Sequence, residues 1–291
     1  MASLRDIRRR IRAVRNLQQI TKAMELVAAS RMRRAQQRVL ASRPYAQAMH
    51  TMIAQLGAAR GTGEALHPLL VRRPIRTLGL VMLTTDRGLC GALNTNVIRR
   101  GTEFLLEAEQ PVEVVTVGRK GQNFLIRRGR KLRATFTNLG DQPDYMATVP
   151  IARVVIDDFI NGTIDAAYLL FPRFVSTVVQ RPEIVQLLPI TPPELSEAER
   201  RRGVEYIFEP NPQAILSALL PRFVEVAIYQ AILETIASEQ SARMVAMRNA
   251  NDNARELIAN LTLTYNQARQ AAITREVLEI ASAAQALAAR E

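Results

Sequence analysis

The 291-residue sequence is poor in the residues that build metal sites, disulfides and base-stacking surfaces. It contains no tryptophan, two histidines and one cysteine, Cys90. A single cysteine excludes an internal disulfide and is typical of a reducing compartment. Two histidines without a second thiol offer no cluster of the kind that binds zinc. We therefore expect neither a metal nor any other cofactor.

Long apolar runs are missing as well. No stretch of eighteen consecutive apolar residues occurs, so we expect no segment to insert directly into a membrane. The N-terminus is rich in arginine but has no apolar core of the signal-peptide type, which argues against secretion. Because its pattern continues without a break into a long helix, we do not expect a transit peptide either.

Glycine is absent after Gly203, and the stretch that follows predicts one very long helix. Asn211 is a suitable cap, Pro212 suits the first helical position, and Pro221 predicts a kink or a delayed start. Two columns of residues repeat every seven positions, which predicts a coiled-coil seam rather than a helix that covers a core. The first column contains Leu216, Phe223, Gln230, Ala237, Met244, Asn251, Ile258, Tyr265 and Ala272, and the second contains Leu219, Val226, Leu233, Gln240, Met247, Ala254, Leu261 and Ala268. The helix would be about 115 Å long.

The N-terminal 57 residues predict a second long helix. Apolar residues follow a spacing of three and four from Leu4 to Val14. They resume after one short step with Leu17, Ile20, Met24 and Val27. The short step predicts a local slip of the seam, and Pro44 predicts a bend.

Between the helices, residues 75–190 predict an α/β domain. Short apolar runs alternate with amphipathic segments, which predicts a sheet with right-handed crossovers. The expected strands are Leu78–Leu83, Val112–Val117, Leu132–Phe136 and Ala166–Phe171, with Glu183–Leu188 at an edge, and the expected helices lie near Ala92–Ala108, Lys120–Arg127 and Tyr145–Ile160. The chain thus divides into a coiled-coil helix (1–57), a linker (58–74), the α/β domain (75–190), a linker (191–210) and a second coiled-coil helix (211–291).

The inserted domain returns the chain, so we expect the two helices to pair antiparallel. Their unequal lengths leave roughly 24 residues of the second helix, or about 36 Å, without a partner helix. This tip begins near Asn266 and carries an apolar stripe of Ile273, Val277, Ile280, Ala284 and Leu287. Because a lone helix with an apolar stripe does not remain exposed in water, we infer that the tip lies inside a partner protein.

The net charge of +12 is concentrated at one end of the chain. Residues 1–57 contain 12 Lys and Arg against 2 Asp and Glu, residues 58–210 contain 20 against 17, and residues 211–291 contain 7 against 8. The basic character therefore belongs to the first helix, which should face an acidic partner.

Motifs for catalysis are not found. Two loops that follow expected strands contain paired glycines, Gly88–Gly91 and Gly118–Gly121, but neither has the spacing of a phosphate-binding motif. We favour glycines that are needed for tight turns. Asp157 and Asp158 have no histidine or further carboxylate in motif spacing, and Cys90 has no catalytic companion. The sequence therefore predicts no enzyme that acts alone.

Four stretches resemble the gamma subunit of F-type ATP synthases. They are ITKAMELVAASRM (Ile20–Met32), TDRGLCGALN (Thr85–Asn94), SEQSARMVAMRNANDNA (Ser238–Ala254) and LTLTYNQARQAAITREVLEI (Leu261–Ile280). The likeness covers essentially the whole chain, although Ala92 stands where the family usually has a second glycine. It implies a long antiparallel two-helix coiled coil, made by the N- and C-terminal helices, with an inserted Rossmann-like α/β domain. It also implies a central rotary stalk that transmits torque and has no catalytic residues of its own.

The resemblance further implies partners and contact residues. The partners would be three alpha and three beta subunits, the epsilon subunit and the membrane ring of c subunits, at the cytoplasmic face of a bacterial cell membrane. The implied contacts are Met24, Arg34 and Arg243 with acidic loops of the beta subunits, Arg87 and Cys90 with one of those loops and with epsilon, Arg269 and Gln270 with another beta-subunit loop, Ile273 and Ile280 with the apolar sleeve of the head, and Tyr206 and Glu209 with the c ring.

Two other functional classes remain open. The pI of 10.8 favours a basic coiled-coil arm that binds nucleic acid. Against it, no aromatic residue lies among the basic positions from Arg5 to Arg43 to stack on bases. Steep salt dependence of DNA or RNA binding would support that arm. An enzyme built on the α/β domain is the other class, and nucleotide titration of the protein would test it.

Overall fold

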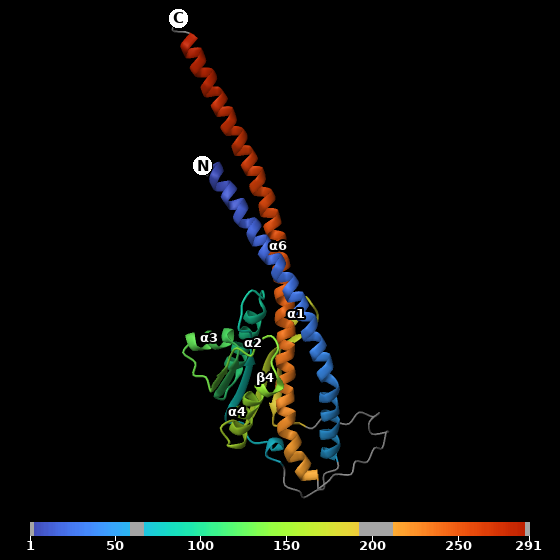
Figure 1. Ribbon diagram of the computed structural model, residues 1–291. Coiled ribbons are helices and arrows are strands. Elements are labelled where there is room, and N and C mark those ends of the chain that lie inside the picture. Colours follow the sequence, from blue (N-terminus) through green and yellow to red (C-terminus); the bar gives the residue numbers. More distant parts are fainter. Residues whose placement is uncertain (1–2, 59–66, 192–211, 289–291) are drawn as a thin grey trace. The chain divides into compact units, whose positions relative to one another are not determined.

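The computed structural model describes residues 3–58, 67–191 and 212–288. The chain forms two compact units. We call residues up to Val27 together with those from Met244 the coil unit, and residues Ala28–Arg243 the domain unit. Two helices, α1 (Leu4–Ala58) and α6 (Pro212–Ala288), contribute to both units (Figure 1).

Five strands form one mixed sheet in the domain unit. They are β1 (Leu78–Leu83), β2 (Val112–Val117), β3 (Ala134–Phe136), β4 (Ala166–Phe174) and β5 (Gln180–Leu188), in the order β3-β2-β1-β4-β5. The first four are parallel and β5 is antiparallel to β4. All six residues of β1 are buried, as expected for a central strand that is covered on both faces. The predicted strands, including the edge strand, are confirmed.

Short helices precede β1 and connect the strands that follow. They are η1 (Pro68–Leu70), α2 (Leu93–Glu107), α3 (Arg119–Arg127), η2 (Tyr145–Ala147) and α4 (Val149–Ile160). The single helix predicted near residues 145–160 is divided into η2 and α4. A proline in the first turn of α4 explains the break, because it cannot donate the backbone hydrogen bond that a continuing helix would need.

The two faces of the sheet have separate hydrophobic cores. Leu80 and Met82 of β1 pack in one core together with Val97 of α2 and Leu125 of α3. The alternate residues of β1 point into the other core, which α4 and α6 complete. The domain unit is therefore a three-layer structure in which the long helix α6 occupies part of one layer (Figure 1).

The prediction that α6 is only a coiled-coil helix is wrong for its first half. Leu220, Val224 and Ile228 are fully buried in the core that also contains the sheet residues. Met49 and Ile53 of α1 belong to the same core. The seven-residue columns did not reveal this, because a helix between a sheet and another helix is apolar on more than one face.

The antiparallel pairing of α1 and α6 is confirmed in the coil unit. An equal step forward along α1 and backward along α6 leads from one contact to the next there, as antiparallel pairing requires, and the two helices also touch in the domain unit. The contacts are a hydrogen bond from Arg8 to Tyr265 and an ion pair of Arg248 with Glu25 in the coil unit, and an edge-on ring contact of His50 with Phe223 in the domain unit.

By length and composition alone, α6 passes the criteria for crossing a membrane over Gln213–Ala283, with a mean hydropathy of 1.5 in its most apolar window. Leu220, Val224 and Ile228 in this helix are already buried in the protein core, and Arg222 lies among them. Packing within the domain unit thus accounts for these apolar residues. The absence of direct membrane insertion stays a prediction.

Candidate functional site: the helix surfaces and the carboxyl edge of the sheet

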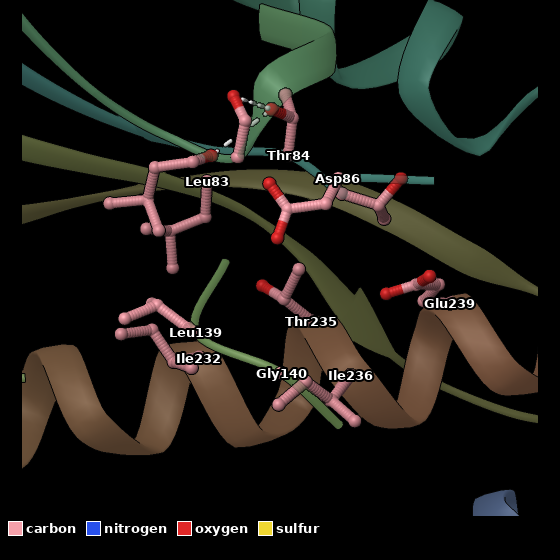
Figure 2. A pocket seen from close by; sticks show the side chains of 12 residues that line it. Leu83, Thr84, Asp86, Leu139, Gly140, Ile232, Thr235, Ile236 and Glu239 are labelled. Atoms are coloured by element: carbon pink, nitrogen blue, oxygen red, sulfur yellow. Dashed lines mark hydrogen bonds between the residues drawn. The ribbon is translucent and has the colours of Figure 1, made fainter. Parts of the chain in front are cut away.

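The carboxyl edge of the sheet is where an α/β fold normally binds a ligand. Here β1 and β2 end at Leu83 and Val117, and Thr235, Ile236 and Glu239 of α6 lie against this edge (Figure 2). The remaining cavity has a volume of about 40 Å³. That volume admits water molecules, whereas small-molecule pockets measure roughly 300–1,000 Å³. The usual ligand site of the fold is therefore filled by the long helix.

Polar side chains at this edge form hydrogen bonds with backbone groups. The carboxylate of Asp86 accepts hydrogen bonds from the backbone N–H groups of Arg119 (3.0 Å) and Asn138 (2.9 Å). The hydroxyl of Thr84 donates to the carbonyl of Val117 (3.1 Å) and accepts from the N–H of Gly121 (2.9 Å). Both side chains thus hold loops together.

Glycines near this edge are required by close packing. Gly118 has a φ of 93°, and a Cβ there would lie 2.1 Å from the carbonyl oxygen of Thr84. A Cβ on Gly121 would lie 2.6 Å from Cε of Met82. The prediction that this loop contains structural glycines is confirmed at Gly118, where the positive φ and the backbone contact exclude a side chain; at Gly121 a Cβ would require the side chains of Met82 and Thr84 to shift.

The loop after β1 presents Arg87 and Leu89 to solvent. Thr85 donates a hydrogen bond to the carbonyl of Arg87 (2.6 Å), and Asn94 donates to the sulfur of Cys90 (3.2 Å). The side chain of Arg87 is 66% exposed, and Leu89 is exposed with a φ of 63°. Cys90 is buried, and this burial raises the pKa of its thiol. Of the two predicted contact residues, only Arg87 is on the surface.

Arg243 is directed into the protein, in contrast to its expected role at a partner surface. Its residue exposure is 8%, and its guanidinium donates to Glu239 (2.6 Å) and to the carbonyl of Gly88 (3.1 Å). Burial raises the pKa of Glu239, and the charge of Arg243 opposes that shift. The charge-assisted hydrogen bond to this buried carboxylate, one helical turn away, holds the guanidinium inside. The contact of Arg243 with a partner stays a prediction.

Asp141 joins three elements, and sequence reasoning missed it. Its carboxylate accepts hydrogen bonds from Arg31 of α1 and from Gln240 of α6 (3.2 Å). One guanidinium nitrogen of Arg87 lies 3.6 Å from the same carboxylate. The residue follows β3 in a loop without any motif, so nothing in the sequence singled it out.

The slip predicted in α1 is wrong. The seam of the coil unit keeps its spacing of three and four through polar residues, with Thr21 and Glu25 only 5% and 7% exposed. Leu17, Ile20 and Val27, which were expected in the seam, are 54%, 56% and 51% exposed. The seven-residue repeat was therefore a better guide to the seam than apolarity.

A charged group is stabilised inside this seam. The carboxylate of Glu25 accepts hydrogen bonds from Lys22 (3.1 Å) and Arg248 (3.2 Å), and the bond from Lys22 is the main reason that its pKa is lowered. Met24 is half-buried beside it, and Asn251 of α6 is buried. The seam is thus partly polar inside while apolar side chains remain outside.

Eight arginines of α1 are exposed and form no ion pair with any residue in the described ranges. They are Arg5, Arg8, Arg10, Arg12, Arg15, Arg33, Arg34 and Arg43. Arg34, a predicted contact residue, is therefore a free cation with respect to the described part of the chain. A row of such cations is suited to an acidic surface.

The tip of α6 is exposed, as predicted. Arg269 and Gln270 are on the surface, and Ile273, Val277 and Ile280 are 51%, 58% and 70% exposed. Exposed apolar residues recurring along one helix mark an interaction surface.

Some predicted residues lie outside the description. Tyr206 and Glu209 fall outside the described residues, and so do the side chains of Ala284 and Leu287. Within the described ranges, no group of three or more His, Cys, Asp or Glu side chains is arranged to hold a metal ion.

Comparison with known proteins identifies close relatives over the full length. A family model described as ATP synthase matches residues 3–287. The ATP synthase gamma chain of Dehalococcoides mccartyi (strain CBDB1) is 54% identical over 288 residues, which cover 99% of this chain and all of the relative. The ATP synthase gamma chain of Roseiflexus castenholzii is 52% identical over 292 residues, covering 99% of each chain.

Solved structures with the same fold come from rotary complexes. A chain from the central stalk and c ring of Tetrahymena thermophila mitochondrial ATP synthase is 25% identical, with a TM-score of 0.61 and coverage of 79% of this chain and 99% of that chain. A chain from the Euglena gracilis mitochondrial ATP synthase has a TM-score of 0.67 at 21% identity, with coverage of 98% and 94%. The second likeness concerns the fold alone.

These findings give no support to a nucleic-acid-binding arm. The family match and the curated relatives extend over both long helices and the inserted domain. The chain belongs to the ATP synthase gamma chain family.

Proposed function

We propose that this chain is the central rotor stalk of an F-type ATP synthase. It transmits torque between a proton-driven ring of c subunits and a head of three alpha and three beta subunits, and it contacts epsilon. It drives ATP synthesis without catalytic residues of its own, as a peripheral protein at the cytoplasmic face of a bacterial cell membrane. Sequence identities of 54% and 52% to two gamma chains, over 99% of this chain, support this proposal.

The inverted polarity of the coil unit carries the proposal. Thr21 and Glu25 occupy the seam, while Leu17, Ile20 and Val27 are exposed. A helix pair that functions in water has the opposite arrangement, because exposed apolar surface is unfavourable. This arrangement suits a helix pair that is enclosed by a partner with an apolar inner surface.

The tip fits the same sleeve. Ile273 and Ile280 would contact its apolar wall, and Arg269 and Gln270 would hydrogen-bond a beta-subunit loop. The exposure of all four side chains supports this assignment. Met24 would lie at the wall of the sleeve, where its half-buried position allows it to contact both the seam and a partner.

The cations would contact acidic beta-subunit loops. Arg34 and Arg87 are exposed and suited to this, whereas Arg243 would first have to leave Glu239. Cys90 would support the Arg87 loop from beneath. Tyr206 and Glu209 would stand on the c ring. Each exposed pair contributes only about 0–1 kcal/mol, so many weak contacts act together.

Rotation would change the face that each beta subunit meets. The basic side belongs to α1 and the apolar tip belongs to α6, so the pair is asymmetric around its axis. A beta subunit that contacts different faces in turn would shift between conformations of different nucleotide affinity.

The domain unit would serve as the handle of the stalk. Because α6 fills the carboxyl edge of the sheet and completes one of its cores, the domain would pack firmly on the helix instead of binding a ligand. A torque applied to the domain would thus reach α6 through packed side chains, which resist deformation.

Reconstitution with alpha and beta subunits of the same source tests the proposal. We expect one copy of the chain to co-elute with three alpha and three beta subunits in size-exclusion chromatography, and the complex to hydrolyse ATP. Removal of residues 266–291 should weaken the complex, whereas Leu106→Ala, an exposed change on α2, should not. Elution of the intact chain apart from the other subunits would contradict the proposal.

A further inference from the structure

Five charged side chains from four elements gather at one end of the domain unit's sheet. The cations are Arg31 of α1, Arg87 of the loop after β1, and Arg243 of α6. The anions are Asp141 of the loop after β3, and Glu239 of α6. Three cations thus face at most two anions, and one cation lacks a carboxylate of its own.

Of the three arginines, Arg87 has the weakest contacts within the chain. Arg243 is buried and bonded to both Glu239 and the carbonyl of Gly88. Arg31 donates a hydrogen bond to Asp141. The guanidinium of Arg87 lies 3.6 Å from Asp141 and donates no hydrogen bond to any residue in the described part of the chain, and its side chain is 66% exposed. Arg87 is therefore free to take another carboxylate.

The carboxylate of Asp141 is held in place by two other side chains. Gln240 of α6 donates to one of its oxygens, and Arg31 of α1 donates to the other. Its carboxylate is thereby fixed between two helices. Any outside carboxylate that binds Arg87 must compete with this fixed internal one.

We infer that Asp141 is a positioning residue that competes with a partner carboxylate for Arg87. The inference rests on the proposed function, in which Arg87 meets an acidic loop of a beta subunit. An exposed ion pair is worth only about 0.2–1 kcal/mol, so exchange between the two carboxylates is close to balanced. A balanced exchange suits a contact that forms and breaks as the stalk turns, because neither state traps the arginine.

A double-mutant cycle tests the competition in the assembled system. The measurement is the affinity of the full-length chain, labelled with a fluorophore, for the head of three alpha and three beta subunits. Asp141→Asn keeps the size of the side chain and an acceptor for Gln240 but removes the charge. We expect it to tighten binding about 1.4- to 5-fold at low salt, the range that 0.2–1 kcal/mol allows. High salt should remove most of this gain.

The dependence on Arg87 separates positioning from a structural role. In an Arg87→Gln background, Asp141→Asn should change the affinity less, because Arg31 is then the only arginine that loses its ion pair with Asp141. Asp144→Asn is the matched control, since it removes a charge from the same loop at an exposed position and contacts none of the arginines. It should have no effect in either background.

Arg31→Gln provides a second variant in case Asp141→Asn does not fold. It makes Arg87 the only arginine that pairs with Asp141, so Arg87 is held more tightly. Binding to the head should therefore weaken up to several-fold, and this weakening should disappear in the Arg87→Gln background. An equal effect of Asp141→Asn with and without Arg87 overturns the inference, as does an equal effect of Asp144→Asn. If the unaltered chain does not bind the head at all, the proposed function fails and the inference fails with it. If the chain binds but the effects of the two substitutions simply add, only the inference fails.

Discussion

The helix α6 is buried very differently in the two units. In the domain unit, nearly every residue from Ala231 to Ser241 is buried, because a sheet, loops and α1 surround the helix. In the coil unit, burial is confined to one narrow face with Met247, Asn251 and Ala254. One continuous helix thus acts as a core element in one unit and as half of a thin pair in the other.

Buried polar groups also differ between the units. In the domain unit, Ser238 and Ser241 of α6 donate to the carbonyls of Pro172 (2.8 Å) and Thr177 (2.7 Å), which fastens the β4–β5 hairpin to the helix. In the coil unit, the buried polar side chains are Thr21, Asn251 and Glu25, and the carboxylate of Glu25 is paired with two cations. Short hydroxyls strengthen a core without a charge, whereas a buried carboxylate fixes register at some cost in stability.

The largest expected effect contrasts one truncation in each unit. Ile228→Ala in the domain unit should lower the free energy of unfolding by about 2–5 kcal/mol, because it leaves a cavity in the shared core. Leu263→Ala in the coil unit is exposed and should change it by less than about 0.5 kcal/mol. Urea unfolding monitored by circular dichroism measures both. Equal losses would erase the distinction between the two parts of α6.

A smaller effect of opposite sign is expected in the seam. Asn251 is buried, and its side chain makes no hydrogen bond to the residues that the structure describes. Because its amide atoms are not among the fully buried unpaired groups, Asn251→Leu should stabilise the free chain by only about 0.5–1 kcal/mol. Asn253→Leu, at an exposed position two residues later, is the control and should not raise the melting temperature. A lower melting temperature for Asn251→Leu would show that the asparagine contributes to stability as it stands.

The two units should respond to pH in opposite directions. The pKa of Glu25 is lowered from 4.5, chiefly by its bond to Lys22, so its contribution is present above pH 4.5 and is lost as the pH falls through the folded pKa. The pKa of Glu239 is raised by burial, so its contribution is present at low pH and is lost as the pH rises through the folded pKa.

Unfolding free energies between pH 3 and pH 8 check these signs. In the unaltered chain, Glu25 increases the free energy of unfolding as the pH rises through about 4.5, and Glu25→Gln should abolish this increase. Glu239 decreases the free energy of unfolding as the pH rises above 4.5, and Glu239→Gln should abolish this decrease. The same slope for both variants would contradict the assignment of opposite shifts.

The smallest effect concerns the surface arginines. Arg9→Gln breaks an exposed ion pair with Asp6, and Arg34→Gln removes an exposed cation without an ion pair among the described residues. Both should change the free energy of unfolding by less than about 0.5 kcal/mol. Arg34→Gln should nevertheless weaken binding to the alpha and beta head at low salt. Thermal melts and a binding titration separate the two quantities, and loss of stability for Arg34→Gln would point to a structural contact instead.

Much of the fold was predictable because it depends on local pattern. The run Leu78–Leu83 was predicted as a strand with the bounds that β1 has, since six apolar residues in a row suit a strand covered on both faces. The exposed tip followed from the unequal lengths of the two helices. Partner contacts for Met24, Arg34, Arg269 and Gln270, and the division into five segments, stay predictions.

The sequence by itself determined the elements, the antiparallel pairing and the location of the basic charge, because periodicity and composition act along the chain. Only the tertiary structure decided which residues share a contact. It placed Glu25 instead of Leu17 in the seam, turned Arg243 inward to Glu239, and brought Asp141 to Arg87. Such choices depend on which charges and surfaces meet across distant segments, and the free energy of a buried charge is set by those neighbours.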